Sequence, residues 1–272
     1  MGSITNFLEN ELIDHVLNAA YSPPATVYLA LCTSDPGEAA TGASMNEVAN
    51  SNGYARKAIT FNAAANRAVV QAANVIFDEA TGSWGTVTHW AIVDSATHGA
   101  GNCLAYGALG TSKTIAAGNT PQVAAGEVYI EFLTGGVSDY LAHKLLDLAF
   151  RNVAYSRPDT YIGLATATVA DDDTGSTITE PDGADAYARI LIDENGGSAP
   201  AWTVATGGAA ENADDIEFPT ASGDWGTIVA SVICDAANGG NLLFYDNDLT
   251  DQAVATDDQV RFLAGDVTIT LD

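Results

Sequence analysis

Basic residues are the scarcest chemical class in this sequence. The chain of 272 residues carries 9 Lys and Arg against 35 Asp and Glu, which gives a formal net charge of −26 at pH 7. Such a surface repels the phosphates of nucleic acids and of anionic membranes, so both make poor partners. We therefore expect no nucleic-acid partner and no membrane insertion.

Lysine is nearly absent, with Lys57, Lys113 and Lys144 as the whole set. An acidic excess with few lysines is typical of proteins from high-salt environments. Molar salt shortens the screening length to about 3 Å, which removes the self-repulsion that opens such a chain in dilute buffer. The sequence thus favours a halophilic source, and an acidic protein from a mesophile is the alternative.

Long hydrophobic runs and paired cysteines are also missing. No apolar run approaches 18 residues, which predicts that no helix spans a membrane. The N-terminal stretch "MGSITNFLENEL" carries Glu9 and Glu11 and no basic segment, so we expect no signal peptide. Cys32, Cys103 and Cys234 share no metal-binding spacing, and we interpret them as small buried apolar residues.

What the sequence does contain is the same unit twice. "WGTVTHWAIVD" at residues 84–94 returns as "WGTIVASVICD" at residues 225–235. Five further matched blocks follow one order, and their offset lies between about 133 and 141 residues. The matched pairs are residues 12–31 with 145–164, 53–56 with 186–189, 75–86 with 216–227, 101–109 with 240–249, and 124–132 with 263–271. This order predicts two tandem domains, residues 1–134 and 135–272, joined near Gly135 and Gly136.

Each unit begins with a helix and continues as short strands. "NFLENELIDHVLNA" and "DYLAHKLLDLAFRN" place apolar residues at helical spacing, with Asn6 and Asp139 as candidate N-caps. Runs such as "TVYLALCT" and "EVYIEF", separated by Gly, Asn and Asp clusters, are typical of antiparallel strands. The predicted fold is mainly β: two tandem antiparallel β-sandwich, jelly-roll-like domains, each preceded by an N-terminal amphipathic helix.

Six residues at matched positions are candidate structural anchors. They are Trp84, Trp225, Arg56, Arg189, Asp14 and Asp147. The tryptophans open the repeated Trp-Gly-Thr turn and are expected to be buried. The arginines are expected to form a salt bridge with the helix aspartates, or a hydrogen bond to a helix end.

The sequence offers only weak candidates for a set of catalytic residues. His89, Asp94 and Ser95 come closest to a catalytic triad, but the second unit has Ala230 in place of the histidine, and no Gly-x-Ser-x-Gly turn occurs. The four histidines also lack the spacing of a zinc site. We interpret His89 as a structural or surface histidine and assign no catalytic residue and no cofactor-binding residue.

The stretch "DDDTGSTITE", residues 171–180, offers the best metal ligands. Asp171, Asp173 and Glu180 are weak candidates for holding Ca²⁺ or another hard cation. Gly175 comes too early for the calcium-loop pattern, so a solvated acidic loop is favoured. Trp202, in a Gly-rich region, is a candidate for contact with a host glycan, although burial in a satellite core is favoured.

Several of these motifs together carry a family resemblance. "NFLENELIDHVL", "PATVYLAL", "GYAR", "WGTVTHWAI" and "AAGEVYI" resemble a recurrent unit in virion proteins of tailed bacteriophages and related archaeal viruses, often labelled tail-fibre or virion structural proteins. The resemblance covers nearly all of residues 5–132 and, more loosely, 139–272. It implies a structural part of a virus particle and brings no active-site residues with it.

We therefore expect a non-enzymatic structural component of a tailed virion, either a capsid decoration or turret or a tail-fibre-type protein. Its expected partners are further copies of itself, with a trimer as the first guess, and capsid or tail proteins. The N-terminal helix and the sheet edges are the expected docking surfaces. Its expected location is the virion, after assembly in the host cytoplasm. The alternative function is a host-glycan-binding adhesin, and a depolymerase has no support because no nucleophile, base and orienting group occur together.

Overall fold

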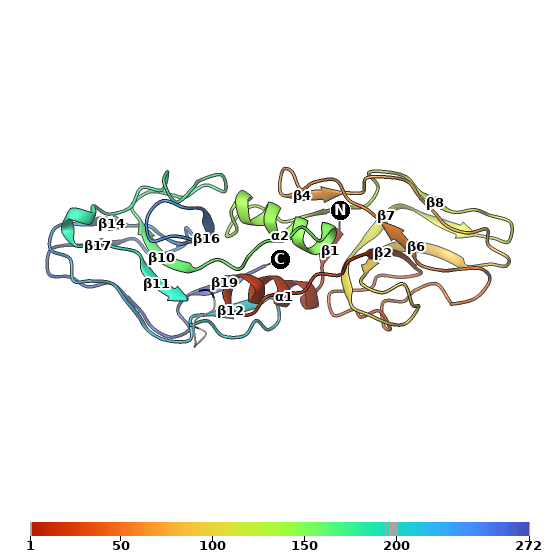
Figure 1. Ribbon diagram of the computed structural model, residues 1–272, viewed down its shortest axis with the longest axis horizontal. Coiled ribbons are helices and arrows are strands. Elements are labelled where there is room, and N and C mark those ends of the chain that lie inside the picture. The colour runs from red at the N-terminus through yellow and green to blue at the C-terminus, as the bar shows by residue number, and fades with distance from the viewer. Residues whose placement is uncertain (1, 194, 196–200, 272) are drawn as a thin grey trace.

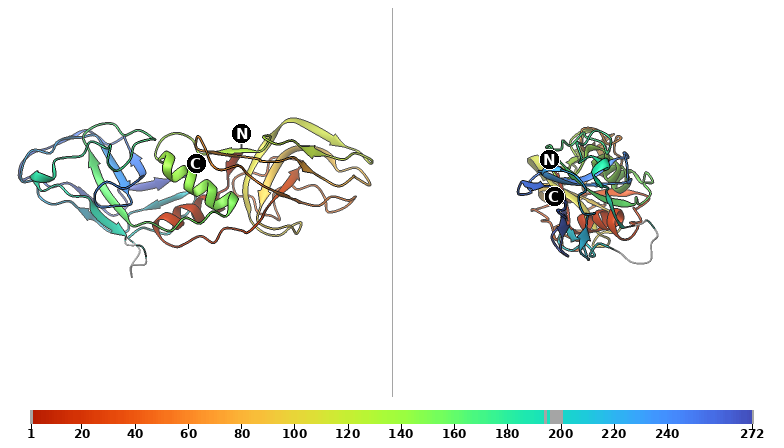
Figure 2. Two further views of the ribbon diagram at one scale, coloured as in Figure 1. Left: turned by 45° about the horizontal axis from the view of Figure 1, so that its top comes forward. Right: turned by 90° about the vertical axis from the view of Figure 1, so that its left-hand side faces the viewer.

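The computed structural model describes residues 2–193, 195 and 201–271, and it is elongated (Figure 1). We call the residues up to 134 the first repeat and those from 135 onward the second repeat. The strands of the two repeats lie toward opposite ends of the long axis, and both helices lie in the middle (Figures 1 and 2). Neither described helix has the length and apolar character that crossing a lipid bilayer requires.

The first repeat forms a curled, mostly antiparallel sheet. Its elements are β1 (Gly2–Ile4), α1 (Asn6–Leu17), β2 (Val27–Cys32), β3 (Lys57–Ile59), β4 (Ala68–Val70), β5 (Val75–Ile76), β6 (Gly85–Val93), β7 (Cys103–Ile115), β8 (Gln122–Val123) and β9 (Tyr129–Glu131). Seven strands pair in the order β3-β2-β6-β7-β1-β9-β4, and β5 pairs with β8. The short strand β1 runs antiparallel to β7 and parallel to β9, so it joins the two parts of the sheet.

The second repeat follows the same order of elements. They are α2 (Asp139–Arg151), β10 (Thr160–Ala165), the short 3-10 helix η1 (Gly183–Asp185), β11 (Ile190–Asp193), β12 (Ala209–Glu211), β13 (Ile216–Glu217), β14 (Gly226–Ile228), β15 (Ala230–Cys234), β16 (Leu242–Asp246), β17 (Gln252–Val254), β18 (Arg261–Phe262) and β19 (Thr268–Thr270). Strands β11-β10-β15-β16 form one sheet, while β12-β19, β13-β18 and β14-β17 pair separately. The prediction of a mainly β chain, in two tandem units that each carry a helix, is confirmed.

The repeats differ where β1 lies. In the second repeat, the segment that matches β1 contributes a single bridge, between Val137 and Phe244. Gly135 and Gly136 have φ angles of 100° and 76°, in the region that favours glycine. The chain arriving from the first repeat therefore turns at these residues and does not run on as a strand between β16 and β19.

The helices begin one residue earlier than predicted. Their N-caps are Thr5 and Ser138, and not Asn6 and Asp139. Each cap hydroxyl accepts a hydrogen bond from the amide three residues on, and donates one to a carbonyl of its own sheet, at 2.6 Å on β7 and 2.5 Å on β16. The hydroxyl side chain serves both bonds, and the helix start is thereby tied to its own repeat.

The apolar side of each helix is buried. The fully buried side chains of α1 are those of Leu8, Leu12, Ile13, Val16 and Leu17. The matching set of α2 is Leu141, Ala142, Leu145, Leu146 and Ala149. The prediction that the N-terminal helix is a docking surface is therefore wrong for its apolar side, because that side is already covered within the chain.

Candidate functional site

The most extensive polar site is the contact between the repeats, where each helix reaches across to the other repeat. Asp14 on α1 accepts a hydrogen bond from the backbone amide of Ala205, at 2.9 Å. Asp147 on α2 accepts one from the amide of Ala64, at 2.8 Å. The two pairs occupy matched positions, and Figure 1 shows α1 beside β12 and α2 beside β4. The repeats thus exchange helix contacts reciprocally.

A second matched pair of contacts lies one helical turn earlier. Asn10 accepts from the amide of Gly208, at 2.9 Å, and the Nε2 atom of His143 accepts from the amide of Arg67, at 3.0 Å. Gly208 and Arg67 have φ angles of 74° and 61°, so both hairpins present their amides through a left-handed turn residue. The same patch is used from both sides, which is the property of an isologous, two-fold interface.

The interface departs from symmetry at these turn residues. Arg67 donates to the carbonyls of Phe132 and Leu133 and, at 2.7 Å, to that of Val137, and it pairs with Asp139 at 3.1 Å. Its guanidinium therefore holds the segment that connects the repeats. Gly208 has no side chain that could do the same. A larger residue would not fit there, because a Cβ atom would lie 2.6 Å from the carboxylate of Glu9.

His15 adds a further contact across the interface. Its Nδ1 atom accepts from the amide of Tyr21, at 3.0 Å, so its Nε2 atom carries the proton donated to the carbonyl of Tyr155, at 2.9 Å. Burial lowers the pKa of the imidazole, which keeps the ring neutral at neutral pH. His15 thus links α1 to the segment that follows α2.

We expect the helix contacts that cross between the repeats to couple the unfolding of the two repeats. Asp14→Ala and Asp147→Ala each leave one amide of the opposite repeat without its acceptor, at a cost of about 1–3 kcal/mol in the free energy of unfolding. Calorimetry of either variant should show one transition at a lower temperature. Asp182→Ala, which removes an exposed carboxylate bonded within its own repeat, is the matched control. Two separate transitions, only one of them shifted, would contradict the coupling.

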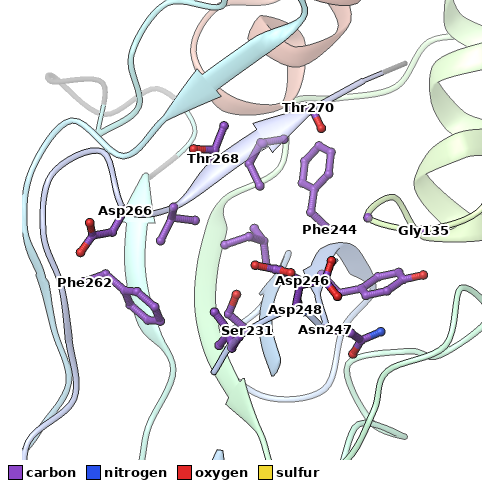
Figure 3. Close-up of a pocket in the computed structure, with 16 residues that line it drawn as sticks. Gly135, Ser231, Phe244, Asp246, Asn247, Asp248, Phe262, Asp266, Thr268 and Thr270 are labelled. Atoms are coloured by element: carbon purple, nitrogen blue, oxygen red, sulfur yellow. Dashed lines mark hydrogen bonds between the residues drawn. The ribbon is translucent and has the colours of Figure 1, made fainter. Parts of the chain in front are cut away.

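A cavity of about 590 Å³ lies in the second repeat, between β16 and β19 (Figure 3). Its lining includes the buried side chains of Ile233, Phe244 and Ile269. The exposed carboxylates of Asp246, Asp248 and Asp266 also border it. The cavity is therefore apolar inside and acidic at its rim.

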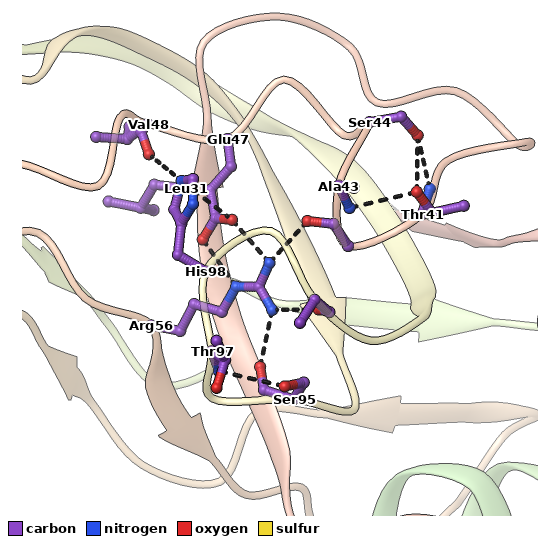
Figure 4. A network of polar contacts seen from close by, with 12 residues as sticks. Leu31, Thr41, Ala43, Ser44, Glu47, Val48, Arg56, Ser95, Thr97 and His98 are labelled. Atoms are coloured by element: carbon purple, nitrogen blue, oxygen red, sulfur yellow. Dashed lines mark hydrogen bonds and ion pairs between the residues drawn. The ribbon is translucent and has the colours of Figure 1, made fainter.

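Each repeat also contains a buried arginine cluster, and Figure 4 shows that of the first repeat. Arg56 is 5% exposed and pairs with both carboxylate oxygens of Glu47, at 2.9 and 2.8 Å. Its remaining three N–H groups donate to the carbonyls of Gly42, Ser95 and Ala100, at 2.8–2.9 Å. All five guanidinium donors are thus satisfied, and three loops are tied to one side chain.

The second repeat reproduces this cluster. Arg189 pairs with both oxygens of Glu180, at 2.9 and 2.7 Å, and donates to the carbonyls of Gly175, Ala236 and Gly239. In both repeats a tyrosine hydroxyl also donates a hydrogen bond to the glutamate. It accepts one from a backbone amide of β2 in the first repeat and of β10 in the second. Burial, followed by the nearby carboxylate, raises the pKa of both tyrosines, Tyr54 and Tyr187.

The predicted pairing of Asp14 with Arg56, and of Asp147 with Arg189, is wrong. Both arginines pair with glutamates of their own repeat, whereas both aspartates lie at the interface between repeats. Asp147 forms its ion pair with Arg151, at 2.8 Å along the same helix. The glutamates were missed, although Glu-x6-Tyr-x-Arg occurs in both repeats, at residues 47–56 and 180–189, and this spacing marks the cluster.

Trp84 and Trp225 lie in matched aromatic clusters. They are 5% and 2% exposed, and each meets a tyrosine edge to face, with ring centroids 5.2 and 5.4 Å apart. The partners are Tyr54 and Tyr187, whose hydroxyls belong to the arginine clusters. The Trp-Gly-Thr turn is thereby packed against the same cluster in each repeat.

Loss of an arginine should destabilise its cluster strongly. Arg56→Met leaves the buried carboxylate of Glu47 without its arginine, which costs about 3–5 kcal/mol. Arg189→Met does the same to Glu180, whose side chain is 20% exposed, so the loss should be smaller. Arg56→Lys should recover part of this loss, because an ammonium keeps the charge but cannot reach three carbonyls and both oxygens. Denaturant unfolding at high salt measures the differences. A loss below about 1 kcal/mol, the range of exposed pairs, would contradict the structural role.

The catalytic and metal candidates do not converge. Asp94 accepts both of its hydrogen bonds from Asn102, at 2.7 and 2.8 Å, and the Nδ1 atom of His89 bonds to Thr88, at 2.8 Å. Among the hydrogen bonds of the described residues, none joins His89 to Asp94 or Ser95. The three residues therefore do not form a triad here.

The candidate metal ligands of the acidic loop, residues 171–180, also bond to separate partners. Glu180 is held by Arg189, Asp171 accepts from the hydroxyl of Tyr245, and Asp173 accepts from a turn amide and from a threonine hydroxyl, both at 2.8 Å. Within residues 2–193, 195 and 201–271, no three His, Cys, Asp or Glu side chains are placed to hold a metal ion together. The structure therefore does not support the three candidate ligands. Asp171 and Asp173 are residues of the acidic loop, and Glu180 belongs to the arginine cluster.

Trp202 is buried, as the favoured interpretation expected, and the structure contradicts the candidate contact with a glycan. The residue is 1% exposed, and its indole donates to the hydroxyl of Thr160, at 3.1 Å. A backbone bridge to Asn212 holds this segment against the sheet, with the ring in the core. A sugar needs an exposed aromatic face for stacking, which this ring does not offer.

One comparison with known proteins bears on function. The family model described as Podophage GP4 fiber I protein gp80 matches residues 3–131 and, a second time, residues 136–270. The two matches correspond to the two repeats, and residues 132–135 lie between them. No curated protein matches the chain.

Proposed function

Because the chain belongs to the family described as Podophage GP4 fiber I protein gp80, whose members are structural components of virions, we propose that it builds a fibre-type appendage of a tailed virus particle. This role is favoured over a capsid decoration or turret. The proposed role is non-enzymatic. The protein would assemble in the host cytoplasm and stay with the virion.

The observation that carries this proposal is the reciprocal helix exchange in an elongated molecule. A fibre segment must resist separation along its length. Here the two repeats, which extend toward opposite ends of the long axis, are joined at the centre by contacts of Asp14 and Asp147 that cross in both directions. Pulling the repeats apart requires both sets to break together. We place the division between the repeats at residues 134 and 135, within the segment that Arg67 holds.

The proposed partners are further copies of this chain, with a trimer as the first arrangement to test, and other virion proteins of the tail or capsid. The apolar sides of both helices are used inside the chain, so the open edges of the sheets remain for docking. These include β3 and β11, which end their sheets. The glycan-binding alternative rested on Trp202, whose ring is buried, and we do not propose it.

Purified particles test the virion role. Mass spectrometry should find the chain in mature virions at many copies per particle, and immunogold labelling should place it on the tail and not on the capsid shell. Native mass spectrometry of the isolated chain measures the oligomer. Absence from mature particles would overturn the proposal, and label on the capsid shell would return it to a decoration protein.

We also propose that the particle works at high salt, as the net charge of −26 suggests. Raising KCl from about 0.1 M to 2 M shortens the screening length from about 10 Å to less than 3 Å, so self-repulsion should fade and the free energy of unfolding should rise. Near about pH 4, where many carboxylates are protonated, the salt effect should shrink. A stability that is flat or falls with KCl at pH 7 would contradict a halophilic adaptation.

A further inference from the structure

The cavity of the second repeat occupies the place that β1 fills in the first repeat. Gly2 of β1 lies opposite Gly107 on β7 and opposite Ile130 on β9, so one strand closes the sheet. In the second repeat the matching strands, β16 and β19, belong to separate sheets, and the cavity of about 590 Å³ lies between them. Figure 3 shows Ser231 and Phe244 on one side and Thr268 and Thr270 on the other.

The backbone explains why this place is open. Val137 reproduces the pairing of the last residue of β1, and the carbonyl of Gly136 accepts from the amide of Tyr245, at 2.9 Å. At Gly135 the chain has turned away. Apart from these contacts, the described strand pairing joins β16 only to β15 and β19 only to β12. Residues 136–138 thus occupy the outer edge of β16 as far as Tyr245. Among the described strands, that edge lacks a partner only from Asp246 onward, whereas β19 has a partner strand on one side only.

The side chains enlarge the same opening. In the first repeat the indole of Trp90 lies beneath β1: a Cβ atom on Gly2 would lie 2.2 Å from its Cη2 atom, and one on Gly107 would lie 2.6 Å from Cζ2. The matched residue of the second repeat is Ser231, which lines the cavity. Replacing an indole by a hydroxymethyl group leaves space for one large side chain supplied from outside.

The charge around the cavity indicates what kind of segment would enter. Asp246, Asp248 and Asp266 border an apolar interior, and the whole chain carries a net charge of −26. A second copy of this chain would bring the same charge, and its own β1 is already paired. A segment with Lys or Arg on either side of a bulky apolar residue is complementary to both the rim and the interior.

We propose that this cavity binds an extended, basic segment of another protein by β-strand addition. The segment would pair with the free edge of β19 and with β16 from Asp246 onward, beyond the stretch that residues 136–138 already cover, and would place one bulky apolar side chain over Ser231. Backbone hydrogen bonds supply affinity in such additions, and the side-chain pocket supplies selectivity. This inference goes beyond the virion role and does not depend on it.

A synthetic peptide tests the proposal on the full-length chain. The probe is fluorescein-labelled Lys-Lys-Thr-Trp-Thr-Val-Thr-Lys, which alternates like β1 and carries one tryptophan, and the readout is fluorescence anisotropy. We expect saturable binding below about 1 mM. A peptide with alanine in place of tryptophan, and one with glutamates in place of the lysines, should each bind at least about tenfold more weakly.

Two variants of the protein locate the binding. Ser231→Trp fills the cavity as Trp90 fills it in the first repeat, and it should weaken binding of the probe by about tenfold or more, with the melting temperature checking that the chain is folded. Asp248→Lys should weaken binding of the lysine probe and strengthen that of the glutamate peptide. Asp224→Lys makes the same charge change beside β14 and should leave binding unchanged; β14 lies near the far end of the second repeat (Figure 1).

Four results would overturn the proposal. They are no binding of the probe up to about 1 mM, equal binding of the alanine peptide, unchanged binding by folded Ser231→Trp, and an equal effect of Asp224→Lys and Asp248→Lys. Dimerisation of the chain that Ser231→Trp abolishes would also overturn it, because a second copy would then be the occupant.

Discussion

The burial of two helices by both repeats at once is the constraint on which the rest of this structure depends. Each helix is capped by a hydroxyl that bonds to its own sheet, while an aspartate nine residues later, about two and a half turns, accepts a hydrogen bond from an amide of the other repeat. Neither repeat can keep its own helix and release its neighbour's without exposing fully buried leucines, each of which contributes about 1.5–3 kcal/mol when buried. The elongated shape follows, because the sheets must extend away from a shared centre.

Within this arrangement the two repeats have kept one feature and changed another. The arginine cluster is retained bond for bond, since a guanidinium buried beside a glutamate leaves no tolerance for a missing acceptor. The place that β1 occupies has diverged. In the first repeat it is filled by β1 and by the indole of Trp90, and in the second repeat it is a cavity above Ser231. Both repeats need the arginine cluster to hold their loops together, so its residues recur in both. Only the first repeat closes its sheet with β1, so the residues around that place differ.

The sequence predicted what depends on local pattern and on internal comparison. The helices, the mainly β character and the two units follow from helical spacing, alternation and the matched blocks. The pairing of Asp14 with Arg56 was wrong, because two residues that recur in register need not touch each other. The glycan candidate Trp202 is buried, as the favoured alternative expected, because a hydrogen bond to Thr160, 42 residues away, and a bridge to Asn212 hold it in the core. The helix contacts between the repeats could not be predicted either, because they join residues 76 to 198 positions apart.

The acidic composition fits this arrangement of buried polar groups. With 9 basic residues in the chain, the arginines are a limited resource for neutralising carboxylates, and the structure uses several of them where water is excluded. Arg56 and Arg189 close loop clusters, and Arg67 holds the connection between the repeats. Many of the carboxylates lie exposed at the surface. Hence the interior is specified by a few fully bonded cations, and the outer surface is an anionic field that selects partners of opposite charge.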